Sequence, residues 1–283
     1  MQQVAQSQAV PQVRSRPREG SRGGDTALWY AVPTSLFLGF ILLPLAALVW
    51  RAVLDPTLWA SLTKPMVLDA LWVTGLTASA TLLLAILVGT PLAYVLARRQ
   101  FPGKWLVETV TDLPLVLPPV TAGVALLMAF GRRGTLGPSL SVLGIELPFT
   151  MTAVVLAQFF VAGSFYIRGA KLGLAAVTQE VEEAAAVDGA SAWASFWYVT
   201  LPLAWPGITS GIVLCLARAV SEFGATLMFA GNFTGRTQTM SLAIMAALET
   251  DLSAALALAV MLIGIAAAVL VLSRVMADHW GDR

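Results

Sequence analysis

Long apolar runs alternate with short polar segments along most of this chain. A helix of about 20 residues crosses a hydrocarbon core about 30 Å thick, and six runs are close to that length or longer. They are residues 27–50, 70–97, 113–130, 149–167, 206–229 and 254–275. Because lipid offers no partners for backbone polar groups, each run must be helical. The pattern predicts an all-α integral membrane protein whose transmembrane domain, residues 27–276, has six membrane-spanning helices.

The two ends of the chain differ from this domain. Residues 1–26 are rich in Gln, Ser, Pro and Gly and include four arginines. Such a composition has too little apolar surface to offset the entropy lost on ordering, so we expect a flexible basic tail. A secretory signal also starts with a basic region, but the next run is long enough to span and lacks a small-residue cleavage site. Residues 277–283 form a short C-terminal tail.

The composition agrees with a membrane location. Hydrophobic residues make up 58% of the chain and charged residues 12%, against about 25% charged in soluble domains. The formal net charge of +1 indicates neither a nucleic acid nor an acidic partner. The single cysteine, Cys215, excludes an intrachain disulfide, and the single histidine, His279, lies in the C-terminal tail. We therefore expect no catalytic residue, no metal site and no cofactor in this chain.

The distribution of Lys and Arg predicts the orientation in the membrane, because cytoplasmic loops carry the excess. With the N-terminus inside, eleven of the 17 lie on the cytoplasmic side, five lie outside, and Arg218 lies within a run. The inner set is Arg14, Arg16, Arg18, Arg22, Arg98, Arg99, Lys104, Arg168, Lys171, Arg274 and Arg283; the outer set is Arg51, Lys64, Arg132, Arg133 and Arg236. Both termini are predicted to be cytoplasmic.

The third and fifth runs contain residues that are unusual in a membrane helix. Pro118 and Pro119 remove backbone donors and predict a kink, which either lines a translocation pathway or serves packing alone. Arg218 and Glu222 each cost about 2.5–3.5 kcal/mol at the centre of a span. Because they are four residues apart, they share a helix face and can partly neutralise one another. They form either a self-satisfied pair in the bundle interior or an element of the pathway or its gate.

The loop GNFTGRTQTMS after the fifth run combines glycines, hydroxyl groups and one arginine. Free backbone N–H groups with Asn232, Arg236 and Thr237 suit contact with a small oxyanion at the outer mouth. An ordinary external turn is the alternative.

The chain has no phosphate-binding P-loop, because Lys64, Lys104 and Lys171 are not followed by Ser or Thr. Any energy from ATP must therefore come from a partner subunit.

The polar stretch EVEEAAAVDGASAWASFWYVTLP, residues 180–202, lies between the fourth and fifth runs. Acidic residues and alanines predict a short helix, and Gly189 predicts a turn. Ser191 is placed to cap a second short helix with an aromatic face, which Leu201 and Pro202 are expected to end. An amphipathic connector on the membrane surface is the alternative.

Motif and spacing in this stretch resemble the EAA loop of ABC-importer permease subunits. The matching residues are Glu183, Ala184, Ala185, Gly189, Leu201 and Pro202. The resemblance implies that the short helix is a coupling helix, which inserts into a cleft on an ATPase and transmits nucleotide-driven motion.

Longer segments, within residues 65–275, resemble the molybdate permease subfamily. They are TPLAYVLARRQFPGK, LPLVLPPVTAGVALLMAFGRRGTLGP, AVVLAQFFVAGSFYIRGA and ARAVSEFGATLMFAGNFTGRTQTMSLAIMAALETDL. Sulfate and thiosulfate permeases are similar around SEFGA. The basic N-terminal tail, and Ser221 where Gly is expected, depart from the subfamily pattern.

The resemblance implies a homodimer in the bacterial cytoplasmic (inner) membrane, with the pathway at its twofold axis and no bond chemistry of its own. It also implies two cytoplasmic ATP-binding subunits, which hold ATP and Mg, and an extracytoplasmic molybdate-binding protein. Lipid is the surrounding partner, and no nucleic acid is expected. The alternatives are a sulfate, thiosulfate or tungstate permease of the same architecture, and an ATP-independent channel or carrier.

Overall fold

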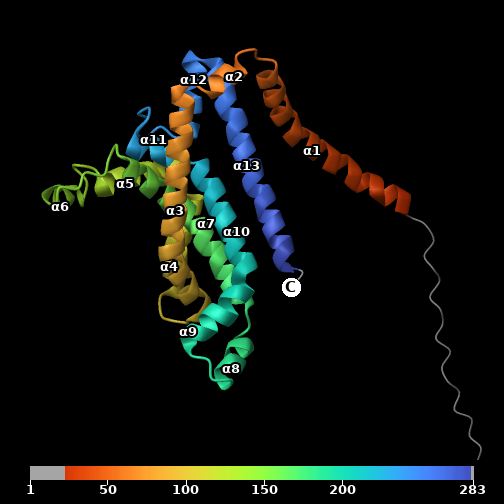
Figure 1. Ribbon diagram of the computed structural model, residues 1–283. Helices are drawn as coiled ribbons and strands as arrows, with labels where there is room; N and C mark the ends of the chain where they lie inside the picture. The colour runs from red at the N-terminus through yellow and green to blue at the C-terminus, as the bar shows by residue number, and fades with distance from the viewer. Residues whose placement is uncertain (1–22, 282–283) are drawn as a thin grey trace, which may run out of the picture. The chain divides into compact units, whose positions relative to one another are not determined.

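The computed structural model describes residues 23–281, and every regular element in that range is a helix (Figure 1). This confirms the all-α prediction. The tail predicted for residues 1–26 lies almost entirely outside the described residues, as do residues 282–283. The chain forms two units, Met1–Val49 and Trp50–Arg283. The first contains most of α1 (Gly23–Val53), in which Trp29–Val53 is long and apolar enough to cross a membrane.

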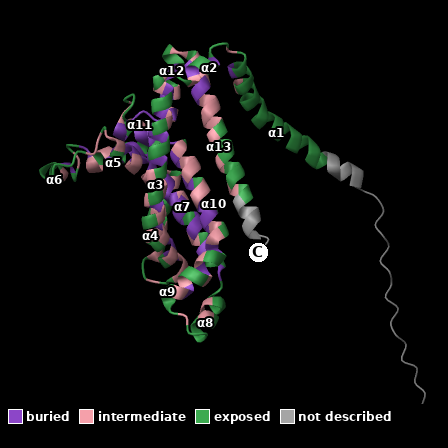
Figure 2. Cartoon of the chain, viewed as in Figure 1, coloured by how far each residue is buried: buried purple, intermediate pink, exposed green. Residues whose placement is uncertain are grey.

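Four long helices dominate the second unit. They are α3 (Pro65–Arg98), α7 (Met151–Ala176), α10 (Leu201–Val220) and α13 (Leu252–Gly281). Helix α7 packs against both α3 and α10 and is the most buried of the candidate spans. In Figure 2 the buried residues accordingly concentrate on α7 and on the sides of α3 and α10.

Glycines make the contact between α7 and α10 possible. A Cβ atom at Gly207 would lie 2.3 Å from Gly173 Cα, and a Cβ atom at Gly169 would lie 2.5 Å from Gly211 Cα. Side chains at these positions would push the two backbones apart. On the α3 side, a Cβ atom at Gly89 would lie 2.8 Å from the ring of Tyr166. Small residues therefore set the spacing of the central helices, as they do in many membrane bundles.

The third apolar run is not the single span predicted for residues 113–130. It is divided between α4 (Lys104–Val116) and α5 (Pro119–Phe130), which are bent by 118° relative to each other. Pro118 and Pro119 have no backbone N–H, and Leu117 is extended, as a residue before proline prefers. The described residues thus contain five long apolar helices, or six spans if this bent pair counts as one.

The fifth run begins earlier than predicted. Helix α9 (Ala192–Ser195) continues through a π-helix, η1 (Phe196–Thr200), into α10, so Leu201 and Pro202 do not end the short helix. In the π-helix the N–H of Leu201 bonds to Phe196 O, and Pro202 falls in the first turn of α10, where proline is tolerated. The prediction that Pro202 stops the helix was wrong for this reason.

Short helices close both ends of the second unit (Figure 1). Helices α2 (Leu58–Leu62) and α12 (Met240–Thr250) lie at one end, and α8 (Gln179–Val187) and α9 lie at the other. At the α12 end, Lys64 Nζ lies 2.5 Å from Asp251 Oδ2, and Asp251 Oδ1 accepts from the N–H of Ala254. These bonds, that of Lys64 above all, hold the pKa of the Asp251 carboxyl below its ordinary value.

Candidate coupling site and transport face

The end of α8 explains the spacing of the EAA-like motif. The N–H of Gly189 bonds to Ala186 O (3.1 Å), and the N–H of Ala190 bonds to Ala185 O (2.9 Å). This pair of bonds is a Schellman motif, which needs a left-handed residue directly after the helix cap. Gly189 has φ +90° and fills that position. Ala185 supplies a carbonyl that accepts a hydrogen bond in this turn, and Gly189 supplies the left-handed residue. The turn geometry therefore explains why the motif places them four residues apart.

Two of the three motif residues of α8 lie at the surface. Glu183 and Ala184 are exposed, and no residue of α8, all of which the structure describes, is fully buried (Figure 2). After the turn, Ser191 Oγ accepts from the N–H of Ala194 (3.2 Å), which confirms the predicted cap of the second short helix. The insert thus presents a short helix most of whose residues are exposed.

The inner side of α8 is held by residues that the sequence analysis missed. Glu182 Oε1 accepts from Arg98 Nη2 (2.7 Å) and from Thr200 Oγ1 (2.6 Å). Arg98 Nη1 also donates to Val177 O (2.7 Å). From the sequence, Arg98 was used only as one of the Lys and Arg residues that predict the orientation in the membrane. No local signal singled out Glu182 from Glu180 and Glu183, because the contact with Arg98 joins residues 84 positions apart.

The structure brings Arg218 and Glu222 together as predicted. Arg218 Nη2 lies 2.6 Å from Glu222 Oε2. However, Glu222 is not inside a helix: α10 ends at Val220, and α11 (Gly224–Ala230) begins after a break. Glu222 is fully buried, and its Oε1 accepts from the N–H of Ala225 (2.8 Å), so it caps the first turn of α11. The pairing is confirmed, whereas a role in the pathway stays a prediction.

The proline bend lies beside that break. A Cβ atom at Gly224 would lie 2.8 Å from Pro119 Cβ and 3.0 Å from the backbone N of Val120. Pro118 and Pro119 are themselves exposed. Two segments predicted separately as pathway elements, the proline bend and the region of Glu222, are thus neighbours in the fold.

The loop after α11 is ordered by its own hydrogen bonds. Thr237 is fully buried, and its Oγ1 accepts from the N–H of Phe233 (3.1 Å). Arg236 is exposed, whereas Asn232 is partly buried. Of the three residues predicted for the outer mouth, Thr237 holds the loop together and Arg236 is exposed; contact of the three with an oxyanion stays a prediction.

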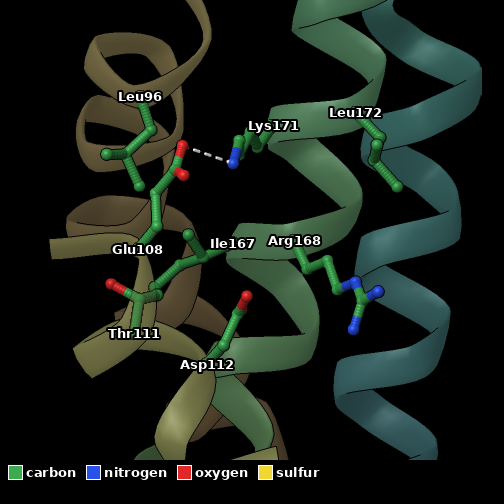
Figure 3. Close-up of a pocket in the computed structure, with 8 residues that line it drawn as sticks. All are labelled: Leu96, Glu108, Thr111, Asp112, Ile167, Arg168, Lys171 and Leu172. Atoms are coloured by element: carbon green, nitrogen blue, oxygen red, sulfur yellow. Dashed lines mark hydrogen bonds and ion pairs between the residues drawn. The ribbon is translucent and has the colours of Figure 1, made fainter. Parts of the chain in front are cut away.

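A cavity of about 210 Å³ opens between α3, α4 and α7 (Figure 3). Within it Lys171 Nζ lies 2.6 Å from Glu108 Oε1, which joins α7 to α4. Arg168 extends away from this pair toward α10, and it is exposed. Arg168 and Lys171 were expected in a loop after the fourth run, 149–167, but α7 continues to Ala176 and contains both.

A second cavity, of about 310 Å³, lies between α7 and α10. Arg168, Ser210, Leu172 and Leu214 are among the residues that line it. No residue in the described part of the chain forms a hydrogen bond or an ion pair with the side chain of Arg168. A cation on an otherwise mainly apolar helical face needs water, an anion or another chain beside it.

A helical membrane domain with an exposed helical insert between its two central helices is the arrangement of a transporter subunit that works with a partner. The chain belongs to the family of binding-protein-dependent transport system inner membrane components, whose pattern matches residues 85–281. Within residues 23–281 the chain has the all-helical architecture expected of this family.

Among its relatives is the molybdenum transport system permease protein ModB of Mycobacterium bovis, which is 41% identical over 245 residues. That alignment covers 87% of this chain and 92% of the relative. The sulfate transport system permease protein CysW of Synechococcus elongatus is 42% identical over 156 residues, which cover 55% of this chain and 54% of the relative.

A solved structure shares the fold. It is a bacterial ABC transporter involved in the import of the acidic polysaccharide alginate, with a TM-score of 0.73 and 18% identity. The match covers 90% of this chain and 96% of the chain in that structure. The predicted ABC-importer permease fold is therefore confirmed, independently of what either protein carries.

Proposed function

We propose that this chain is the permease subunit of an ATP-driven importer that moves molybdate across the bacterial cytoplasmic membrane. The substrate is inferred from the 41% identity, over nearly the whole chain, to a molybdenum transport permease. The shorter match to a sulfate permease supports sulfate as the second candidate, because the two oxyanions have the same charge and a similar shape.

The working complex would contain two copies of this chain and two cytoplasmic ATP-binding subunits, which supply the ATP and Mg site. An extracytoplasmic oxyanion-binding protein would deliver the substrate, consistent with a binding-protein-dependent family. The Lys and Arg distribution supports an orientation with both termini and α8 in the cytoplasm. The loop with Asn232, Arg236 and Thr237 then faces the binding protein.

In this complex α8 is the contact with the ATPase. Glu183 and Ala184 are exposed on it, and the Schellman turn at Gly189 fixes its end. Closure of the ATPase pair would displace α8 and so change the arrangement of the membrane helices. Alternating access requires that the two states differ in their contacts, and an exposed insert joined to several helix ends provides such a difference.

The exposed face of α7 and α10 is the proposed wall of the pathway between the two copies. Arg168 provides a positive charge there that forms no ion pair with a carboxylate of residues 23–281, unlike Arg218, although Asp112 lines the first cavity with it. A divalent oxyanion passing along this face would replace the water around that guanidinium. The bend at Pro118 and Pro119 and the buried Glu222 cap are proposed as elements that move during opening.

Uptake by proteoliposomes that contain the full complex tests the substrate. We expect ATP-dependent uptake of labelled molybdate that excess unlabelled molybdate abolishes and that equal sulfate reduces only weakly. Vesicles loaded with a non-hydrolysable ATP analogue are the control. Sulfate uptake that molybdate leaves unchanged would instead support the sulfate permease.

An ATP-independent channel or carrier is the remaining alternative. It would give molybdate flux without the ATPase subunits and would tolerate substitutions in α8. Flux measured with this chain alone in the same vesicles separates the two mechanisms.

A further inference from the structure

One carboxylate attaches α8 to the membrane helices. Only Glu182 and Ala185 of α8 are partly buried, and the other seven residues of the helix are exposed. Glu182 Oε1 accepts from Arg98, the last residue of α3, and from Thr200, the last residue of the π-helix that runs into α10. The ends of two long helices therefore meet at a single atom of the coupling insert.

Arg98 extends the connection to a third helix. Its guanidinium also donates to the carbonyl of Val177, the residue that caps the end of α7. The Arg98 side chain is 8% exposed and that of Glu182 is 22% exposed, so bulk water does not screen the pair fully. Removing one partner of such a pair leaves an uncompensated charge, so loss of Arg98 or Glu182 disturbs all four segments that these bonds join.

The neighbouring glutamate faces the other way. Consecutive residues of an α-helix are about 100° apart around its axis, so Glu182 and Glu183 lie on different faces. Glu183 is exposed, and its side chain forms no hydrogen bond or ion pair with another described residue. Of these two adjacent acidic residues, Glu182 contacts the membrane helices and Glu183 lies on the outer surface of α8.

We propose that Arg98, Glu182 and Thr200 form a rigid joint through which movement of α8 reaches α3 and α10. Glu182 is a positioning residue in this joint: it acts through the helices it connects and touches neither ATP nor the transported anion. This inference rests on the proposed function, since it assigns the membrane side of the coupling contact. The outer surface of α8, which includes Glu183, makes the contact with the ATPase.

The test uses the full complex with its ATPase subunits and binding protein, in proteoliposomes. Uptake of molybdate and hydrolysis of ATP are measured in the same vesicles for wild type, Glu182→Gln and Thr200→Val. Both variants are nearly isosteric, and each removes one part of the joint. We expect the ATPase subunits to co-purify and hydrolyse ATP, while uptake per ATP falls about 5- to 150-fold, the range of typical coupling energies.

Two further variants separate transmission from docking. Glu249→Gln, at an exposed carboxylate on α12 at the other end of the second unit, is the matched control and should keep the wild-type ratio of uptake to hydrolysis. Glu183→Arg changes the outer surface and should lose the ATPase subunits during purification. A joint that served folding alone would lower thermal stability without changing the ratio of uptake to hydrolysis in the protein that remains folded.

Two results would overturn the proposal: wild-type uptake per ATP in Glu182→Gln, or loss of the ATPase subunits from that variant. If Glu182→Gln does not fold, Thr200→Val decides in the same way, because it leaves the ion pair intact. A wild-type complex without ATP-dependent uptake would instead refute the proposed function.

Discussion

Substitutions at Gly189 separate the geometry of the α8 turn from its contact with another protein. The residue has φ +90°, and a Cβ atom built on it would have no atom within 4 Å. A side chain at this position is therefore strained by the backbone and not by its surroundings. Three variants exploit this: Gly189→Asn, Gly189→Ala and Gly189→Trp.

The magnitude follows from the left-handed conformation. An L-residue other than Asn or Asp loses about 1–2 kcal/mol there, whereas Asn loses less because its side chain bonds locally. A loss of that size lowers the population of the correct turn about 5- to 30-fold. In the isolated chain Ala and Trp should be equally unfavourable, because neither meets a neighbouring atom at Cβ, and Asn should be close to Gly.

In the assembled complex the Ala and Trp variants should no longer be equivalent. If α8 and its turn insert into an ATPase cleft, Gly189→Trp adds bulk at the contact and should abolish ATP-dependent uptake. Gly189→Ala should reduce uptake only by the cost of the turn, and Gly189→Asn should reduce it least. Thermal unfolding of the purified chain and uptake by the complex are the two measurements.

Equal uptake by the Ala and Trp variants would refute this reasoning, because the turn would then lie away from any partner. A lower unfolding temperature for the Trp variant than for the Ala variant in the isolated chain would also contradict it.

Three further predictions concern packing, pH and the pathway. Gly207→Ala should destabilise the chain by about 1–3 kcal/mol, because its Cβ overlaps the backbone of α7; Gly264→Ala, which meets no atom within 4 Å, should be neutral or slightly stabilising in the same thermal assay. The pKa of Asp251 is lowered mainly by Lys64, so the bond contributes stability above about pH 4 that is lost as pH falls through the lowered pKa. The stability gap between wild type and Asp251→Asn should therefore be present at pH 7 and close below pH 4, and a gap independent of pH would contradict this. Arg168→Gln should reduce molybdate uptake about tenfold or more while Arg168→Lys retains part of it, as expected for loss of a charge-assisted contact; equal rates for the two variants would remove Arg168 from the pathway.

The sequence predicted much of the site because its signals are local. The step from Ala185 to Gly189 and the Ser191 cap each depend on a few consecutive residues, and the structure has both. The pairing of Arg218 with Glu222 was predicted for the same reason, since residues four apart are neighbours on one helical turn. The resemblance to permeases then supplied a function for the insert that its composition alone did not.

Hydrophobic length was a poorer guide to where helices bend or stop. The run 113–130 has no charged residue, yet two consecutive prolines and the extended Leu117 turn the chain by 118°. Conversely, Pro202 was expected to end a helix, and a π-turn carries the chain past it. Hydropathy averages over a window, whereas a bend depends on individual backbone hydrogen bonds.

The sequence by itself determined that this is a helical membrane protein with a capped, glycine-terminated insert between two spans, because apolar length and capping are local properties. Only the tertiary structure decided which glutamate of the insert faces the membrane helices. Arg98 and Glu182 are 84 residues apart and meet because α3 and α7 end side by side, a packing fixed partly by Gly89 and Tyr166. Contacts of that kind depend on how helices pack, which no short stretch of the sequence encodes.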